Sequence, residues 1–217
     1  MNTHNDADRD ISKEELILGA AMDIFIEKGW SGARMQEIAD RAGINKALLH
    51  YYFRSKENLY DRIIETVFGS FFRQIETALT DAGTFEEVLK RFIGTIVDTI
   101  SAHPRIPQFI VHELAQGGKN VKYILTSVAG RYGLTLPQRL VALVAEEVKA
   151  GRIRRVDPPQ LIITLLGACI YYFVAEPMVE AIVPHVQPDS VYDRERFLSD
   201  RKESIFDVIY FGLKTRT

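Results

Sequence analysis

The pattern of apolar and polar positions predicts a chain built entirely of helices. Apolar residues recur every three or four positions, the spacing of one helix face, and no stretch alternates long enough to predict a strand. Gly43, Gly83 and Pro104 are among the turn-forming residues that separate the periodic stretches. The helices are expected at 12–29, 35–42, 45–53, 55–81, 84–102, 105–116, 120–131, 135–150, 158–183 and 193–214.

The first of these helices has a recognisable start and end. Ser12 and Glu15 have the spacing of a capping box, in which each side chain satisfies a backbone donor near the other. Gly29 is expected to close the helix. Residues 1–10 are polar except for Met1 and Ala7, and they lack the cationic start and apolar run of a signal peptide. Residues 1–11 are predicted to form a flexible tail.

Residues 35–57 carry the pattern of a helix-turn-helix. Gly43 can adopt the positive φ that ends a short helix, and Asn45 is suited to cap the next one. On this second helix Leu49 and Phe53 are expected to face inward, together with Tyr52. The outward positions are then Lys46, Ala47, His50 and Tyr51, with Leu48 near the boundary.

This outward set suits the major groove of DNA. Lys46 and His50 can bond base edges or phosphates, and Ala47 with Leu48 can meet thymine methyl groups. Tyr51 can donate to a phosphate oxygen. Lys56 follows Ser55, the expected N-cap of the next helix, where a cation opposes the helix dipole. A phosphate bound at that terminus would explain the lysine, and simple solvent exposure is an equal alternative.

Composition and charge add local detail. The chain has 217 residues, 47% of them apolar and 26% charged, as in soluble globular proteins. Its net charge of −2 argues against a polycationic nucleic-acid wrapper. Over residues 28–62, however, seven basic residues oppose four acidic ones, a local excess of +3.

The same composition bears on the compartment. Cys169 is the single cysteine and lies in an apolar run, which indicates a reducing compartment. The longest apolar stretch, 161–175, is short for a membrane span and is expected to form a buried helix. We therefore expect a cytoplasmic protein without a membrane partner.

A group of residues between positions 12 and 62 has a specific joint spacing: Ala20-Ala21, Phe25, Gly29-Trp30, Ile38-Ala39, Ala42-Gly43-Ile44, Lys46, Leu49, Tyr51, Phe53, Ser55-Lys56-Glu57 and Leu59. This segment resembles the DNA-binding domain of TetR-family transcriptional repressors. The resemblance implies a helix-turn-helix domain over 12–58 and a helical effector-binding and dimerisation domain over 59–217. It also implies that 45–53 is the recognition helix and that Lys56 clamps a phosphate.

One departure from the family concerns the start of the helix at 35. The family often has Thr and Ser there, where a hydroxyl caps the helix and touches phosphate; this chain has Ala33 and Arg34. Arg34 can replace the phosphate contact by charge, and Gln36 can reach a base or a phosphate. The full set of expected DNA-binding residues is Arg34, Gln36, Asn45, Lys46, Ala47, Leu48, His50, Tyr51 and Lys56.

The remaining residues are less specific. By resemblance, the helices near 158–183 and 193–214 form a homodimer; the alternative is that both pack only into their own core. Aromatic residues could line an effector pocket, although each is more often plain core: Phe68, Phe72, Phe92, Phe109, Tyr123, Tyr132, Tyr171, Tyr172 and Phe173. The pocket set that we single out is Phe72, Phe109, His112, Glu113 and Tyr172, with no indication of the effector's identity.

The predicted function is sequence-specific DNA binding by a repressor that a small-molecule effector releases from a palindromic operator. No HExxH, Cys/His cluster, P-loop, GxGxxG or GxSxG is present, so no catalytic residue, metal or cofactor is predicted. Two alternatives stay open: an enzyme with a site assembled from distant residues, and an all-α interaction module. The latter would leave four residues unexplained: the outward Lys46, His50 and Tyr51, and Lys56.

Overall fold

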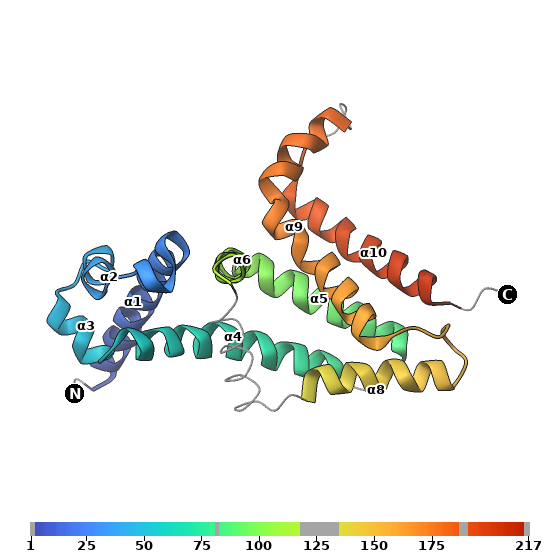
Figure 1. The fold of residues 1–217 in the computed structure, drawn as a ribbon, viewed down its shortest axis with the longest axis horizontal. Helices are drawn as coiled ribbons and strands as arrows, with labels where there is room; N and C mark the ends of the chain where they lie inside the picture. Colours follow the sequence, from blue (N-terminus) through green and yellow to red (C-terminus); the bar gives the residue numbers. More distant parts are fainter. Residues whose placement is uncertain (1–2, 81–82, 118–134, 187–190, 215–217) are drawn as a thin grey trace. The chain divides into compact units, whose positions relative to one another are not determined.

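The computed structural model describes residues 3–80, 83–117, 135–186 and 191–214. Over these ranges the secondary structure is helical throughout, without a strand, and the all-α prediction is confirmed. The helix predicted at 120–131 lies outside the described residues. The helices, labelled as in Figure 1, are α1 (Thr3–Gly32), α2 (Met35–Arg41), α3 (Lys46–Tyr52), α4 (Lys56–Thr80), α5 (Phe85–Ala102), α6 (Arg105–Ala115), α8 (Thr135–Lys149), α9 (Pro158–Val186) and α10 (Arg194–Leu213).

The first helix differs from its prediction at both ends. It begins at Thr3, so Ser12 lies inside α1 and its capping box does not start the helix. Residues 3–11 contain neither glycine nor proline, and a helix formed after them can extend through such a stretch. Gly29 interrupts α1 with φ 68 and ψ 175, after which the chain makes one further turn to Gly32.

The chain packs as two compact units. The first comprises Met1–Ser70 and Gln108–Val128, and the second Phe71–Pro107 and Ala129–Thr217. The division falls within α4, beyond the domain boundary expected after residue 58. The reason lies in the first turns of α4, where the Tyr60 ring packs edge-on against Phe25 and Trp30 of α1.

The core of the first unit is formed by the apolar faces of its short helices. α1 contacts α2, and α2 contacts α3, so the helix-turn-helix is anchored on the first helix. Small and branched residues at these crossings are fully buried and allow close approach. The fully buried side chains include Ile17, Ala21, Phe25, Ile38, Ala39, Leu49 and Leu59.

In the second unit, α5 is the central helix. It contacts both α9 and α10, and α9 also contacts α8 and α10 (Figure 1). Thr84 and Glu87 form a capping box that satisfies the backbone donors at the start of α5. The apolar face of α5 buries Phe92, Ile93, Ile96, Val97 and Ile100.

α9 is more exposed than its sequence predicts. Among the described residues it is the one helix long and apolar enough, by length and composition, to cross a membrane. It packs against α5, α8 and α10 and buries Leu165, Cys169, Tyr172 and Phe173. The opposite face carries exposed apolar side chains, so the predicted burial of 161–175 holds on one face only.

Gly29 provides a test of the first unit's packing. A Cβ atom at this position would lie 2.9 Å from Nε2 of His112, and the positive φ adds backbone strain to any other residue. We expect Gly29→Ala to lower the free energy of unfolding by about 1–3 kcal/mol, measured by urea denaturation. The matched control is Gly94→Ala in α5, where a Cβ meets nothing within 4 Å and stability is expected to rise by about 0.4–1 kcal/mol. Equal stability of the two variants would contradict this account.

Candidate nucleic-acid interface

The turn between α2 and α3 follows from two residues. Gly43 adopts φ 67 at the end of α2, and the Ile44 backbone N–H donates to the Ala39 carbonyl at 3.0 Å. Asn45 precedes α3, and its Oδ1 accepts a hydrogen bond from the Leu48 N–H at 2.8 Å. The predicted N-cap is confirmed. Because Oδ1 holds the cap with one lone pair, the side-chain NH₂ of Asn45 keeps both of its donors for a DNA contact.

The two faces of α3 are divided as the sequence predicts. Leu49 is fully buried and Phe53 is buried just after the helix, while Tyr52 is half-buried. Tyr51 is 79% exposed, and its ring lies edge-on to that of Tyr52 at 5.6 Å. The outward face therefore presents the predicted residues: Lys46, Ala47, His50 and Tyr51 are exposed, and Leu48 is half-buried.

His50 makes one polar contact on this face. Its Nδ1 lies 3.3 Å from the carbonyl oxygen of Arg54, one turn further along the chain. The contact folds the imidazole towards the C-terminal end of α3, where backbone carbonyls lack helical partners. The ring keeps Nε2 free of any hydrogen bond within the described part of the chain.

Ion pairs divide the basic residues of the first unit into those with an acidic partner and those without one in the described ranges. Arg41 forms two hydrogen bonds with the Glu27 carboxylate, at 2.9 and 3.0 Å, and these lower the pKa of Glu27 below its usual value. Two further basic residues are paired in the same unit: Lys28 with Glu37 at 2.9 Å, and Arg62 with Glu14 at 2.7 Å. No ion pair is formed by Arg34, Lys46 or Arg54 within the described ranges. The local positive excess is therefore carried by residues at the start of α2 and on and just after α3.

The start of α2 has no side-chain cap. Arg34 occupies the N-cap position with an extended backbone, φ −120 and ψ 138, and its side chain makes no capping hydrogen bond. Gln36 is exposed, and its Nε2 donates to Oδ1 of Asp40 at 2.8 Å. Arg34 is exposed beside the first turn of α2, where N–H groups lack helical partners, and this combination suits an anion.

Lys56 has a structural role that sequence reasoning missed. Its Nζ donates to the carbonyl oxygens of Trp30 at 2.7 Å and Ala33 at 3.1 Å, and lies 4.7 Å from the centre of the Trp30 ring. The end of α1 leaves such carbonyls without helical partners, so the ammonium at the start of α4 satisfies them. This explains a cation that the dipole of α4 disfavours. One of its three N–H donors is left for the predicted phosphate.

The neighbouring aromatic residues complete this junction. Trp30 stacks on Phe25 at 5.8 Å, and the Tyr60 ring meets Trp30 edge-on at 4.8 Å. Only the proximity of α1 and α4 reveals the Lys56 contact, because Trp30 and Lys56 are 26 positions apart. The sequence feature that could have indicated the Lys56 contact is the Gly29-Trp30 pair, because it marks the end of α1.

Three of the five predicted pocket residues lie in the first unit. Phe109 is fully buried and its ring lies 5.7 Å from that of Tyr60. Glu113 is 1% exposed, and neither its Oε1 nor Nε2 of His112 has a hydrogen-bond partner among the described residues. Burial, with Glu113 nearby, raises the pKa of Tyr60 above its usual value.

The other two lie in the second unit. Phe72 is half-buried, with its ring 5.6 Å from Phe71. Tyr172 is buried; its hydroxyl lies 2.6 Å from that of Tyr192 and donates to Glu176 at 3.0 Å. The five predicted residues are thus divided between the two units.

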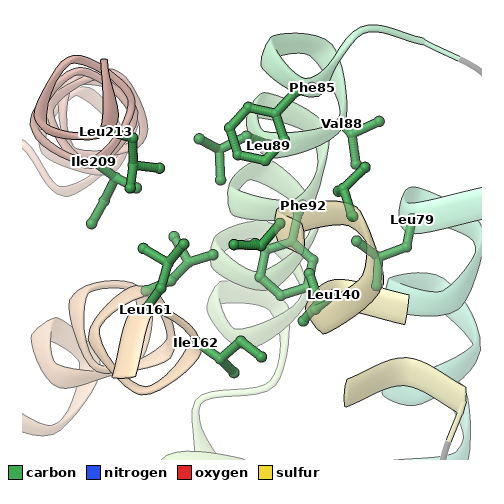
Figure 2. A pocket seen from close by; sticks show the side chains of 13 residues that line it. Leu79, Phe85, Val88, Leu89, Phe92, Leu140, Leu161, Ile162, Ile209 and Leu213 are labelled. Carbon is green, nitrogen blue, oxygen red and sulfur yellow. The ribbon is translucent and has the colours of Figure 1, made fainter. Parts of the chain in front are cut away.

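The cavity shown in Figure 2 lies among α4, α5, α8, α9 and α10 of the second unit, and its enclosed volume is about 20 Å³. That is room for about one water molecule, and apolar walls of this kind keep a cavity dry. Its lining includes Phe92, one of the wider aromatic set, and none of the five singled-out residues. The lining consists of Leu79, Phe85, Val88, Leu89, Phe92, Leu140, Leu143, Val144, Leu161, Ile162, Leu165, Ile209 and Leu213.

These features define a helix-turn-helix DNA-binding protein with a separate helical unit. Residues 17–63 match the family of bacterial regulatory proteins named tetR, and residues 86–209 match the tetracyclin repressor-like C-terminal domain. The second match alone covers more than half of the chain. The chain therefore belongs to the TetR family of transcriptional regulators and is not an enzyme.

Curated relatives and solved structures agree with this assignment. The transcriptional regulator RutR of Escherichia coli K12 is 26% identical over 94% of this chain and 92% of its own length. The transcriptional repressor NicS of Pseudomonas putida is 34% identical over 46% of this chain and 48% of its own length. The fold is similar to that of the fatty acid degradation regulator FadR of Bacillus halodurans, with a TM-score of 0.66 and 21% identity over 94% of this chain and 97% of that one.

The Lys56 junction can be tested without DNA. We expect Lys56→Ala to lower the free energy of unfolding by about 1–3 kcal/mol, because two carbonyls lose a charged donor. It should also shift the emission of Trp30, the only tryptophan in the chain. Urea denaturation followed by fluorescence measures both. Lys46→Ala is the control, since it removes an exposed lysine from the same unit; equal effects of the two substitutions would argue against the junction.

Proposed function

We propose that this protein is a homodimeric repressor in the bacterial cytoplasm, and that a small-molecule effector releases it from a palindromic operator. The observation that carries the proposal is the outward face of α3, where Lys46, His50 and Tyr51 are exposed and Leu49 anchors the helix from behind. A helix held in this way can enter a major groove. The name of the relative NicS supports the repressor assignment.

The contacts divide into two kinds. Lys46 and His50 read base edges, while Ala47 and Leu48 meet thymine methyl groups. Positioning contacts to phosphate come from Tyr51, Lys56 and the exposed first turn of α2, where Arg34 supplies charge. Gln36 and the Asn45 amide lie beside this set, each with one polar atom already bonded within the protein.

The homodimer is supported by exposed apolar side chains on α9 and α10. Ile163 is 65% exposed and Val208 is 72% exposed. Apolar surface of this extent is typical of a surface that a partner covers. A two-fold dimer would also place two recognition helices on the two halves of a palindrome. The exposed set is Ile163, Tyr171, Val174, Met178, Ile182 and Val186 of α9, with Val208 and Phe211 of α10.

Effector control is supported by the apolar cavity of the second unit. Its volume of about 20 Å³ is too small for a metabolite, so a ligand would have to favour a more open packing of these helices. A ligand that binds one arrangement better shifts the population towards it, here a dimer unable to bind DNA. Such a ligand would raise the melting temperature. If no compound that stabilises the protein also changes DNA binding, the cavity has no role in control.

DNA binding is tested with a pool of genomic fragments across a salt series. We expect sequence-selective binding whose affinity falls steeply as salt rises, because cationic side chains displace counterions from phosphates. Lys56→Ala should weaken binding to all sequences alike and reduce the salt slope by about one phosphate. Binding without selectivity, or no binding at low salt, would overturn the proposal.

The dimer is tested by analytical ultracentrifugation. We expect Tyr171→Asp in α9 and Phe211→Asp in α10 to raise the dimer dissociation constant at least ~10-fold, since each places a charge on apolar contact surface. Val191→Asp is the matched control, because Val191 is 94% exposed and lies on neither helix. A monomeric wild-type protein, or equal effects of all three substitutions, would contradict the dimer.

A further inference from the structure

We propose that neutral His50 reads a base edge as a hydrogen-bond acceptor, and so selects adenine or cytosine on one strand at one position of each operator half-site. This inference rests on the proposed DNA-binding function and specifies what one residue of that site recognises. It follows from the contact between His50 and the Arg54 carbonyl, together with the exposure of the rest of the ring.

The carbonyl determines the tautomer of the ring. A carbonyl oxygen can only accept a hydrogen bond, so Nδ1 of His50, at 3.3 Å from the Arg54 oxygen, must carry the hydrogen. In neutral imidazole the other nitrogen then has a lone pair and no hydrogen. Nε2 of His50 is therefore an acceptor. Histidine in water favours the opposite tautomer, so this assignment depends on the turn that follows α3.

The ring that carries this acceptor lies on the outward face of α3. His50 is exposed on the same face of α3 as Lys46 and Tyr51, whereas Leu49 faces the core. Nδ1 is occupied at the end of α3, and Nε2 is the ring's other hydrogen-bonding atom. Lys46 has an ammonium group that can only donate. His50 and Lys46 thus offer opposite hydrogen-bonding character to a groove.

Base edges in the major groove present donors or acceptors, so they distinguish an accepting side chain from a donating one. Adenine N6 and cytosine N4 present N–H donors there, while guanine O6 and N7 and thymine O4 present acceptors. An acceptor at Nε2 can therefore form a hydrogen bond with adenine or cytosine. Opposite guanine or thymine it would meet another acceptor, and no hydrogen bond would form. Phosphate oxygens are also acceptors, so neutral His50 in this tautomer gains nothing from the DNA backbone. Its contribution is sequence selection rather than general affinity.

The tautomer can be measured in the free protein. Nitrogen-15 NMR in slightly alkaline buffer, where an ordinary histidine is neutral, distinguishes a protonated from an unprotonated ring nitrogen. His50→Gln assigns the signal among the five histidines by its loss. We expect Nδ1 protonated and Nε2 unprotonated. A predominant hydrogen on Nε2 would overturn the proposal, whatever the protein binds.

The base preference is measured by selection from a randomised duplex pool in the same buffer. We expect the wild type to favour adenine or cytosine about 3- to 10-fold at one position of each half-site. His50→Ala should abolish the preference at that position alone. His50→Lys replaces the acceptor with a donor and should move the preference to guanine. Tyr51→Phe is the matched control on the same face: it removes a proposed phosphate contact, so it should weaken binding to all sequences alike and leave the base preference at that position unchanged.

The outcomes separate this inference from the proposed function. If no sequence-selective binding occurs, the proposed function fails, and with it the base contact. If selective binding occurs but His50→Ala changes no position, or the wild type does not distinguish the two orientations of the base pair at that position, only the His50 inference fails. A uniform loss of affinity with a reduced salt slope would show that His50 contacts phosphate and would also overturn it.

Discussion

The first unit depends on the contact between the start of α4 and the end of α1. The Lys56 ammonium satisfies the carbonyls of Trp30 and Ala33, which the end of α1 leaves unpaired. The same lysine lies over the Trp30 ring, whose other contacts are Phe25 and Tyr60. Because α2 and α3 lie between these two helix ends in sequence, this contact closes the segment that carries the candidate DNA-binding face.

Charge is distributed so that this face keeps its positive potential. Glu14 and Glu27 of α1 form ion pairs with Arg62 and Arg41, respectively, and neither of these arginines lies on α3. Exposed ion pairs of this kind add little stability, and each neutralises one cation and one carboxylate, so the positive excess is left on Arg34, Lys46 and Arg54. The net charge of −2 is a sum over the whole chain, whereas residues 28–62 carry a local positive excess that suits an anionic partner.

Local sequence signals predicted the helix-turn-helix closely, because caps and turns are decided by neighbouring residues. Asn45 caps α3, Gly43 has a positive φ, and the faces of α3 follow its periodicity. The start of α1 was harder to predict, since a helix can extend through polar residues that contain no breaker. The division between the two units falls within α4, beyond the boundary expected after residue 58, because the first turns of α4 pack on α1.

Periodicity does not separate residues that line a pocket from residues of the core. It marks which side chains face inward, but Phe109 and Tyr172 are buried in different units for reasons of packing, and the apolar cavity is lined by other residues. The same limit applies to α9, whose apolar sequence predicts burial on all sides although one face is exposed.

The sequence by itself determined the all-α architecture, the helix-turn-helix and the outward residues of α3, because these depend on spacings of a few positions. Only the tertiary structure decided what Lys56 bonds within the protein, which cations are paired and where the cavity lies. Those features join residues that are far apart in the chain, and their proximity is produced by packing. The tautomer that we propose for His50 depends on both sequence and structure. Arg54 is only four positions away in the sequence, but its carbonyl meets Nδ1 only because of the way the chain turns after α3.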